Sequence, residues 1–140
     1  MAFSPIFGDA SFFFALAAKR DVAHESAVSQ FAALLRKQRR IVTTDYVLDE
    51  VLTLTKVRAN AIVAVALLDR IEKSEAIELE RVGAARFDLA KSFFRKHADH
   101  GYSFTDCTSF VLMHELCIKE ALTTDRHFIE AGFRPLLPVA

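Results

Sequence analysis

The sequence predicts an α/β fold built on a mostly parallel sheet. Short apolar runs typical of strands alternate along the chain with longer segments whose apolar residues recur at helical spacing. Helices that connect successive strands place those strands parallel in one sheet. The 140 residues are 52% hydrophobic and contain no linker, repeat or low-complexity tract. We therefore expect residues 1–140 to form a single domain with a substantial core.

The first forty residues read as two strands separated by helices. An apolar run over residues 5–8 predicts a buried strand, and the Phe-rich segment 12–18 predicts a helix directly after it. Apolar residues at helical spacing predict a second helix over 24–38, and residues 41–43 read as the next strand. The basic run 36–40 suits a helix C-terminus, with an RNA contact as the alternative.

The middle of the chain adds two helices and a strand. Thr44 or Asp45 can cap a helix that runs to about residue 56. The helix expected over residues 60–73 is apolar almost all round, which leaves two interpretations. It is either deeply buried within the monomer or covered by a second subunit or a partner helix. Residues 77–82 alternate like a half-buried strand near a sheet edge.

Two further helices follow, and the second begins near Asp106. Residues 84–97 predict an amphipathic helix whose inward face consists of Phe87, Ala90, Phe93 and Phe94. The polar segment before Asp106 reads as a loop, with Ser103 or Thr105 available as the cap of the next helix.

The last forty residues predict two more strands around a short helix. Residues 121–125 read as a strand that ends in an acid. A short helix then begins at residue 126 and stops at Gly132, and residues 135–138 suit a final strand.

Composition excludes several classes of protein. The 18 basic and 18 acidic residues cancel, so no global field attracts nucleic acid. Cys107 and Cys117 lie ten residues apart in one expected helix, about 15 Å along its axis, which is too far for a disulfide. We expect both to be reduced, buried thiols. The longest apolar run, residues 61–68, is too short to span a membrane, so a cytoplasmic protein is expected.

Four acidic residues stand at positions where a carboxylate can reach a shared site. Asp9 and Asp125 end predicted strands, and Asp106 falls in the first turn of a helix. Each could simply cap a helix or complement its dipole. Glu50 lies between Val47 and Leu54 on the apolar stripe of its helix, so we expect it to point toward the packed side. There it needs a partner, either an arginine or a cation.

If the four acids converge, their repulsion needs counter-charge. Two carboxylates 4 Å apart repel by about 4 kcal/mol at an effective dielectric near 20. Oxygen-only ligands favour hard cations such as Mg²⁺ or Mn²⁺. Such an ion generates a nucleophile from water and neutralises charge on a phosphate, which is the chemistry of phosphodiester hydrolysis.

The four acidic segments resemble the motifs of PIN-domain ribonucleases, above all VapC-type toxins of toxin–antitoxin pairs. The segments are Asp9-Ala-Ser11, Thr44-Asp-Tyr-Val-Leu-Asp-Glu50, Ser103-Phe-Thr-Asp106 and Leu122-Thr-Thr-Asp-Arg-His-Phe128. Each is weak alone, but the ordered set covers nearly the whole chain. The resemblance implies a three-layer α/β/α sandwich, cleavage of RNA with Mg²⁺ or Mn²⁺, a homodimer and inhibition by a small antitoxin.

The resemblance also assigns roles to individual residues. Asp9, Glu50, Asp106 and Asp125 become the metal-site acids, with Asp9 and Asp106 expected to hold the ion most directly. The hydroxyls of Ser11 and Thr105 support them, and Arg126 contacts substrate phosphate or forms a structural ion pair. The competing interpretation is a non-catalytic member of the same fold that binds RNA or protein, which would be expected to lack one or more of the four acids.

Overall fold

Five parallel strands form one central sheet in the computed structural model, which describes residues 4–139. The strands lie in the order β3-β2-β1-β4-β5, and every neighbouring pair is parallel. Their bounds are β1 Ile6–Gly8, β2 Ile41–Thr44, β3 Ile77–Glu80, β4 Glu120–Leu122 and β5 Arg134–Pro135. The predicted parallel α/β sheet is therefore confirmed, with β3 at one edge as expected.

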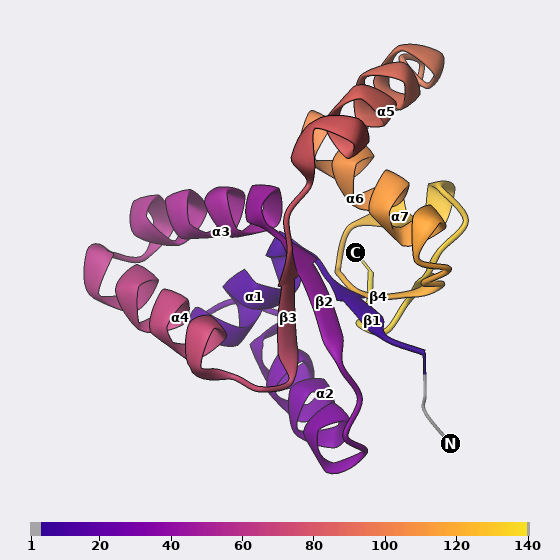
Figure 1. The fold of residues 1–140 in the computed structure, drawn as a ribbon. Helices are drawn as coiled ribbons and strands as arrows, with labels where there is room; N and C mark the ends of the chain where they lie inside the picture. Colours follow the sequence, from indigo (N-terminus) through magenta and orange to yellow (C-terminus); the bar gives the residue numbers. More distant parts are fainter. Residues whose placement is uncertain (1–3, 140) are drawn as a thin grey trace.

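Within residues 4–139, seven helices cover the sheet. They are α1 Ala10–Ala17, α2 His24–Arg36, α3 Asp45–Arg58, α4 Ala61–Lys73, α5 Gly83–Lys96, α6 Phe104–Glu115 and α7 Arg126–Glu130. Helix α1 packs against α2, α3 and α4, whereas α6 packs against α5 and α7. Figure 1 shows these two groups on opposite sides of the sheet, with α5 projecting away from it. This arrangement is the expected three-layer sandwich.

The core is built mainly from the central strands and from phenylalanine. Every residue of β1 and β2 is buried, because helices cover both faces of the sheet. The largest fully buried side chains include Phe7, Phe12, Phe13, Phe110 and Phe128. Full burial of one such side chain is worth about 1.5–3 kcal/mol, so this cluster fixes the helices on the sheet.

Polar caps set the first residue of α3, α4 and α6, among others. The side chain of Thr44 accepts a hydrogen bond from the Val47 N–H at 3.0 Å, and Asn60 caps α4 in the same way at 2.9 Å. At α6 the Ser103 hydroxyl accepts from the Asp106 N–H at 3.0 Å. The sequence left two candidates for the caps of α3 and α6, and the structure selects Thr44 and Ser103.

Two helices expose apolar residues that the sequence pattern placed inside. In α4, Ile62 is 82% exposed and Val65 is 58% exposed, so deep burial of this helix within the monomer is wrong. In α5, Phe87 and Phe94 are 36% and 45% exposed, and only Ala90 is buried. Because α5 projects beyond the sheet and packs mainly on α6, little of its surface is covered by other elements.

The two cysteines differ in environment. Cys107 is fully buried, as expected, but Cys117 is exposed. The expectation for Cys117 failed because α6 ends at Glu115, so this residue lies in the turn beyond the helix, with a φ of 56°.

The basic run 36–40 and the strand-end acids lie at opposite ends of the parallel strands. Arg40 directly precedes β2 and pairs with Glu78 at 2.6 Å, which places the run at the amino ends of the strands. Asp9 and Asp125 follow the carboxyl ends of β1 and β4. Within residues 4–139, no helix is both long and apolar enough to cross a membrane.

Candidate metal centre

The strand order defines where a ligand site is expected. From β1 the chain moves to β2 and β3 on one side, while β4 and β5 lie on the other side of β1. Open α/β sheets bind ligands outside the carboxyl ends of their strands at such a reversal point. Asp9 directly follows β1, and Asp125 stands three residues after β4. The topology thus brings two acids together that are more than one hundred residues apart in sequence.

Asp9 is held by hydroxyl groups from both sides of this point. Its side chain is nearly buried, and its Oδ2 accepts hydrogen bonds from Ser11 and from Thr123, both at 2.9 Å. Burial raises the pKa of Asp9 to about 7; the two hydroxyls oppose this shift, and repulsion from Asp106 adds to it. Both hydroxyl bonds fall on Oδ2, and a hydrogen bond from the backbone N–H of Ala10 to the carboxylate also lowers the pKa of Asp9.

Asp106 combines a helix-starting role with a place in the site. Its Oδ2 accepts the Ser103 N–H at 3.0 Å while Ser103 caps α6, which completes a capping box. The same Oδ2 lies 3.1 Å from Nδ1 of His127. Burial raises the pKa of Asp106, the Ser103 N–H lowers it, and repulsion from Asp125 raises it further. The cap uses one carboxylate oxygen, so the simple capping role and a ligand role are compatible.

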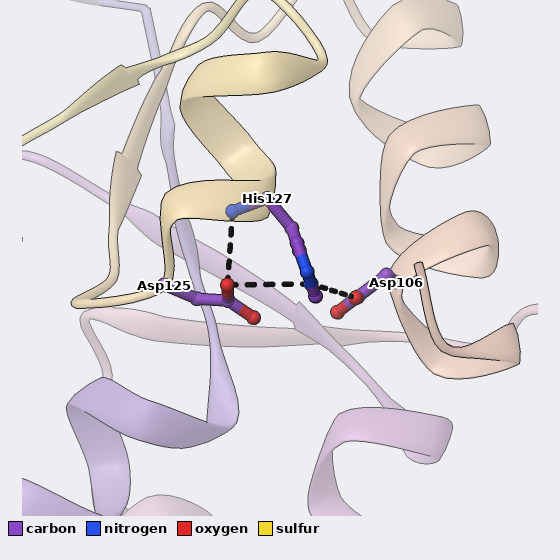
Figure 2. A group of neighbouring side chains, drawn as sticks. All are labelled: Asp106, Asp125 and His127. Atoms are coloured by element: carbon purple, nitrogen blue, oxygen red, sulfur yellow. Dashed lines mark hydrogen bonds and ion pairs between the residues drawn. The ribbon is translucent and has the colours of Figure 1, made fainter. Parts of the chain in front are cut away.

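Asp125 repeats this pattern at the start of α7. Its Oδ1 accepts the backbone N–H of His127 at 2.9 Å and lies 3.4 Å from Nδ1 of the same residue. Figure 2 shows the His127 ring between the two carboxylates, with the dashed contacts falling on one oxygen of each acid. Ligand atoms of Asp106, Asp125 and His127 all lie within 4.8 Å of one another.

Glu50 reaches the site from α3, but not from the packed face of that helix. The buried residues of α3 are Val47, Val51 and Thr55, and Glu50 itself is exposed. The expectation that Glu50 points inward was wrong because the buried stripe follows the spacing i, i+4, i+8 and leaves Glu50 on its flank. In this position the side chain of Glu50 is partly buried. This burial and repulsion from Asp106 raise the pKa of Glu50, while a hydrogen bond with Thr105 opposes the rise.

Repulsion connects all four acids. Asp106 raises the pKa of Asp9 and of Glu50, and Asp125 raises that of Glu50 and of Asp106. No arginine or lysine takes part in the ion pairs of these acids within residues 4–139, where His127 is the only partner found. Concentrated negative charge with unused carboxylate oxygens is the donor set that a hard divalent cation requires. The residues present therefore fit Mg²⁺ or Mn²⁺.

Among the described residues, Asp106, Asp125 and His127 form a group whose ligand atoms lie within 4.8 Å of one another, and Asp9 and Glu50 are not members of that group. The expectation that Asp9 and Asp106 hold the ion most directly stays a prediction. Arg126 is exposed and forms none of the ion pairs found within residues 4–139, so the structural ion pair considered for it is absent there. Ser11 and Thr105 lie against Asp9 and Glu50, respectively.

Sequence reasoning missed Thr123 and His127. Thr123 sits between β4 and Asp125 and donates to Asp9, a contact that spans 114 residues. His127 offered a local signal, because a residue two positions after a capping aspartate donates its N–H to that carboxylate. The side chain of His127 therefore starts beside the site. The sequence pattern had instead suggested the neighbouring Arg126 as a contact to substrate phosphate.

The fold and these acidic motifs define a class of protein. Residues 6–134 match the family model of the PIN domain, and the chain belongs to the PIN domain family. The resemblance drawn from the four motifs is thereby confirmed.

Individual relatives agree in sequence and in structure. The chain is 34% identical to the 23S rRNA-specific endonuclease VapC20 of Mycobacterium tuberculosis over 133 residues, which cover 95% of this chain and 98% of the relative. The crystal structure of VapC20, described as a Sarcin-Ricin loop cleaving toxin, superposes with a TM-score of 0.87 at 33% identity, covering 95% of this chain and 99% of that one.

Two more distant structures share the fold. VapBC2 from Rickettsia felis, bound to a DNA fragment from its promoter, matches with a TM-score of 0.68 at 11% identity, covering 93% of this chain and 96% of that one. FitAcB from Neisseria gonorrhoeae matches with a TM-score of 0.58 at 17% identity, covering 93% of this chain and 94% of that one.

Proposed function

We propose that this protein is an endoribonuclease that hydrolyses RNA phosphodiester bonds with Mg²⁺ or Mn²⁺ and acts as the toxin of a toxin–antitoxin pair. The observation that carries the proposal is the convergence of four mutually repelling carboxylates at the reversal point of a parallel sheet. The likeness to VapC20 along 95% of the chain supports it. When bound, the cation supplies an activated water and neutralises charge on the phosphate.

The contacts suggest a division of labour among the acids. Asp106 and Asp125 belong to one group of ligand atoms within 4.8 Å of one another and are proposed as the direct ligands, each through the oxygen that makes no contact with His127. Asp9 and Glu50 flank them and complete the site, partly through water. Ser11, Thr123 and Thr105 fix the flanking carboxylates by hydrogen bonds. Arg126, exposed one residue after Asp125, is proposed to contact substrate phosphate.

A structured ribosomal RNA hairpin is the proposed substrate. VapC20 is described as specific for 23S rRNA and as cleaving the Sarcin-Ricin loop, and its structure superposes on this chain almost end to end. A net charge of zero agrees with recognition through local contacts rather than through a general attraction to polyanions. We further propose that the chain is one cytoplasmic domain, because ribosomal RNA is found there.

Two partners belong to the proposal. The exposed apolar side chains on α4 and α5, which include Ile62, Val65, Phe87 and Phe94, offer surfaces for an antitoxin and for a second copy of the chain. Resemblance to VapC-type toxins supports both partners. Light scattering of the purified chain, alone and with the product of a neighbouring small gene, measures each association.

The test is cleavage of a synthetic Sarcin-Ricin loop hairpin, with a scrambled hairpin as the RNA control. We expect cleavage with Mg²⁺ or Mn²⁺, none with a chelator, and none by Asp106→Asn at unchanged circular dichroism. The matched control is Asp69→Asn, because Asp69 is an exposed residue of α4 outside the site. Full activity of the Asp106 variant, or of the wild type in chelator, removes the proposed mechanism. Binding without cleavage would instead establish the non-catalytic module.

A further inference from the structure

The ring of His127 lies between the carboxylates of Asp106 and Asp125. Its Nδ1 lies 3.1 Å from Oδ2 of Asp106 and 3.4 Å from Oδ1 of Asp125. In the tautomer that carries its proton on Nδ1, the ring donates to Oδ2 of Asp106 and lies in contact with Oδ1 of Asp125. A protonated Nδ1 has no lone pair for a metal ion, so in this tautomer His127 orients the acids rather than binding the ion through Nδ1.

The contacts also select which carboxylate oxygens stay free. The hydrogen bonds to Asp106, from Ser103 and from His127, fall on Oδ2. Both contacts to Asp125, from the N–H and the ring of His127, fall on Oδ1. One oxygen of each acid is therefore held by the protein while the other is left for a cation. Figure 2 shows the contacts of both acids with His127 and the oxygens that take no part in them.

The protein fixes the ring in place from its outer side. A Cβ on Gly101 would lie only 3.1 Å from Nε2 of His127, so the glycine allows the loop to approach the ring closely. Tyr102 packs edge-on against the ring at 5.6 Å and 78°, and it stacks in turn on His100 at 4.6 Å and 7°. His100 contacts Glu130 of α7 at 3.4 Å. The loop before α6 and the helix α7 therefore clamp His127 together.

We infer that His127 is a positioning residue, which sets the spacing and orientation of the Asp106 and Asp125 carboxylates for the cation by donating its Nδ1 proton to Asp106 while the same atom stays in contact with Asp125. This inference rests on the proposed function, since it assigns a role within the same site. The inference adds a residue to the four acids of the site. It also explains why Gly101 lies so close to the ring of His127. Loss of a group that orients ligating side chains typically weakens metal affinity by about 10–100-fold.

The test compares three variants by Mn²⁺ titration of the purified full-length chain, followed by electron paramagnetic resonance. His127→Phe keeps a ring but removes the donor, whereas the side-chain amide of His127→Asn places a donor where Nδ1 stood. Gly101→Ala leaves His127 intact and displaces its ring. His114→Phe is the control, because His114 is an exposed residue near the end of α6. Cleavage of the hairpin is measured in parallel at limiting and at excess Mn²⁺.

We expect the Kd for Mn²⁺ to rise about 10–100-fold in His127→Phe, to rise less in Gly101→Ala, and to stay near the wild-type value in His127→Asn and His114→Phe. Cleavage by His127→Phe should recover at excess Mn²⁺. An unchanged Kd in His127→Phe overturns the inference, as does an Asn variant as defective as the Phe variant. If His127→Phe does not fold, an unchanged Kd in Gly101→Ala overturns it. A wild type that neither binds Mn²⁺ nor cleaves RNA overturns the proposed function itself.

Discussion

Replacing Asp9 by asparagine should stabilise the metal-free protein, because the folded chain holds this carboxylate in an unfavourable place. Asp9 is only 6% exposed, and burial raises its pKa from 3.8 to about 7. Asparagine has nearly the same shape, and its carbonyl oxygen can accept the hydrogen bonds from Ser11 and Thr123 that Oδ2 accepts now. The substitution therefore removes a buried charge and keeps its polar contacts.

The magnitude follows from the shift in pKa. A shift of about three units, at 1.36 kcal/mol for each, corresponds to about 4 kcal/mol of destabilisation by the ionised group. This is an upper value for Asp9→Asn at pH 8 without metal. For a chain of this length, one kcal/mol moves Tm by about 3 °C, so the variant should melt roughly 10 °C higher.

The effect has a defined dependence on pH. Between about pH 4 and pH 7 the folded chain retains a proton on Asp9 that the unfolded chain has released. Wild-type stability therefore falls as the pH rises through this window, and it loses no more from this group above it. The pKa values of Glu50 and Asp106 are raised as well, which adds loss in the same direction. Asp9→Asn should match the wild type near pH 4 and exceed it increasingly toward pH 8.

The assay is urea unfolding in chelator at pH 4, 6 and 8, with Asp69→Asn as the surface control. Repeating the pH 8 series in Mg²⁺ should reduce the advantage of the variant, because the cation stabilises the wild-type site and binds the variant more weakly. A variant that is no more stable than the wild type at pH 8 in chelator would refute the claim that the buried charge of Asp9 is costly.

Three further predictions concern the surroundings of the site. In metal-free protein, Mg²⁺ at one hundred times its Kd should raise the free energy of unfolding by about 2.7 kcal/mol, and an unchanged Tm with millimolar Mg²⁺ or Mn²⁺ would speak against the site. Gly8→Ala brings a Cβ to 2.8 Å from the Phe13 ring, so it should cost about 1–3 kcal/mol in urea unfolding and weaken Mn²⁺ binding by shifting Asp9; unchanged values would contradict the packing described. Arg86→Met removes the contacts with Glu115 at 2.6 Å and Glu80 at 3.4 Å that tie α5 to α6 and β3, and it should speed amide hydrogen exchange in α5 more than in α4; equal exchange would show that α5 is held by other contacts.

Much of the fold could be read from local patterns. Short apolar runs between helical segments indicated the positions of the five strands and of the helices between them. They did so because a strand that is buried on both faces of a sheet must be apolar along its whole length. Capping residues marked helix starts within a residue or two, as at Thr44 and Ser103. These signals depend on neighbours a few positions apart, so a sequence displays them directly.

Exposure was harder to predict, since amphipathic spacing names a face but not what covers it. The stripe on α5 was correctly periodic, yet Phe87 and Phe94 remain exposed because the helix extends beyond the sheet. Glu50 was placed on the wrong side of α3, since its neighbours in sequence suggested a packed face that the fold builds elsewhere. In both cases the missing information was the position of the next layer.

The sequence by itself determined which acids are candidates for the site and their order, with Asp9, Asp106 and Asp125 at strand ends or helix starts and Glu50 within a helix. Only the tertiary structure decided how they combine. The hydroxyl of Thr123 reaches Asp9, and the ring of His127 joins Asp106 to Asp125, because β4 lies beside β1 and α7 beside α6. Contacts between such distant segments depend on strand order and layer packing, which no local pattern of residues encodes.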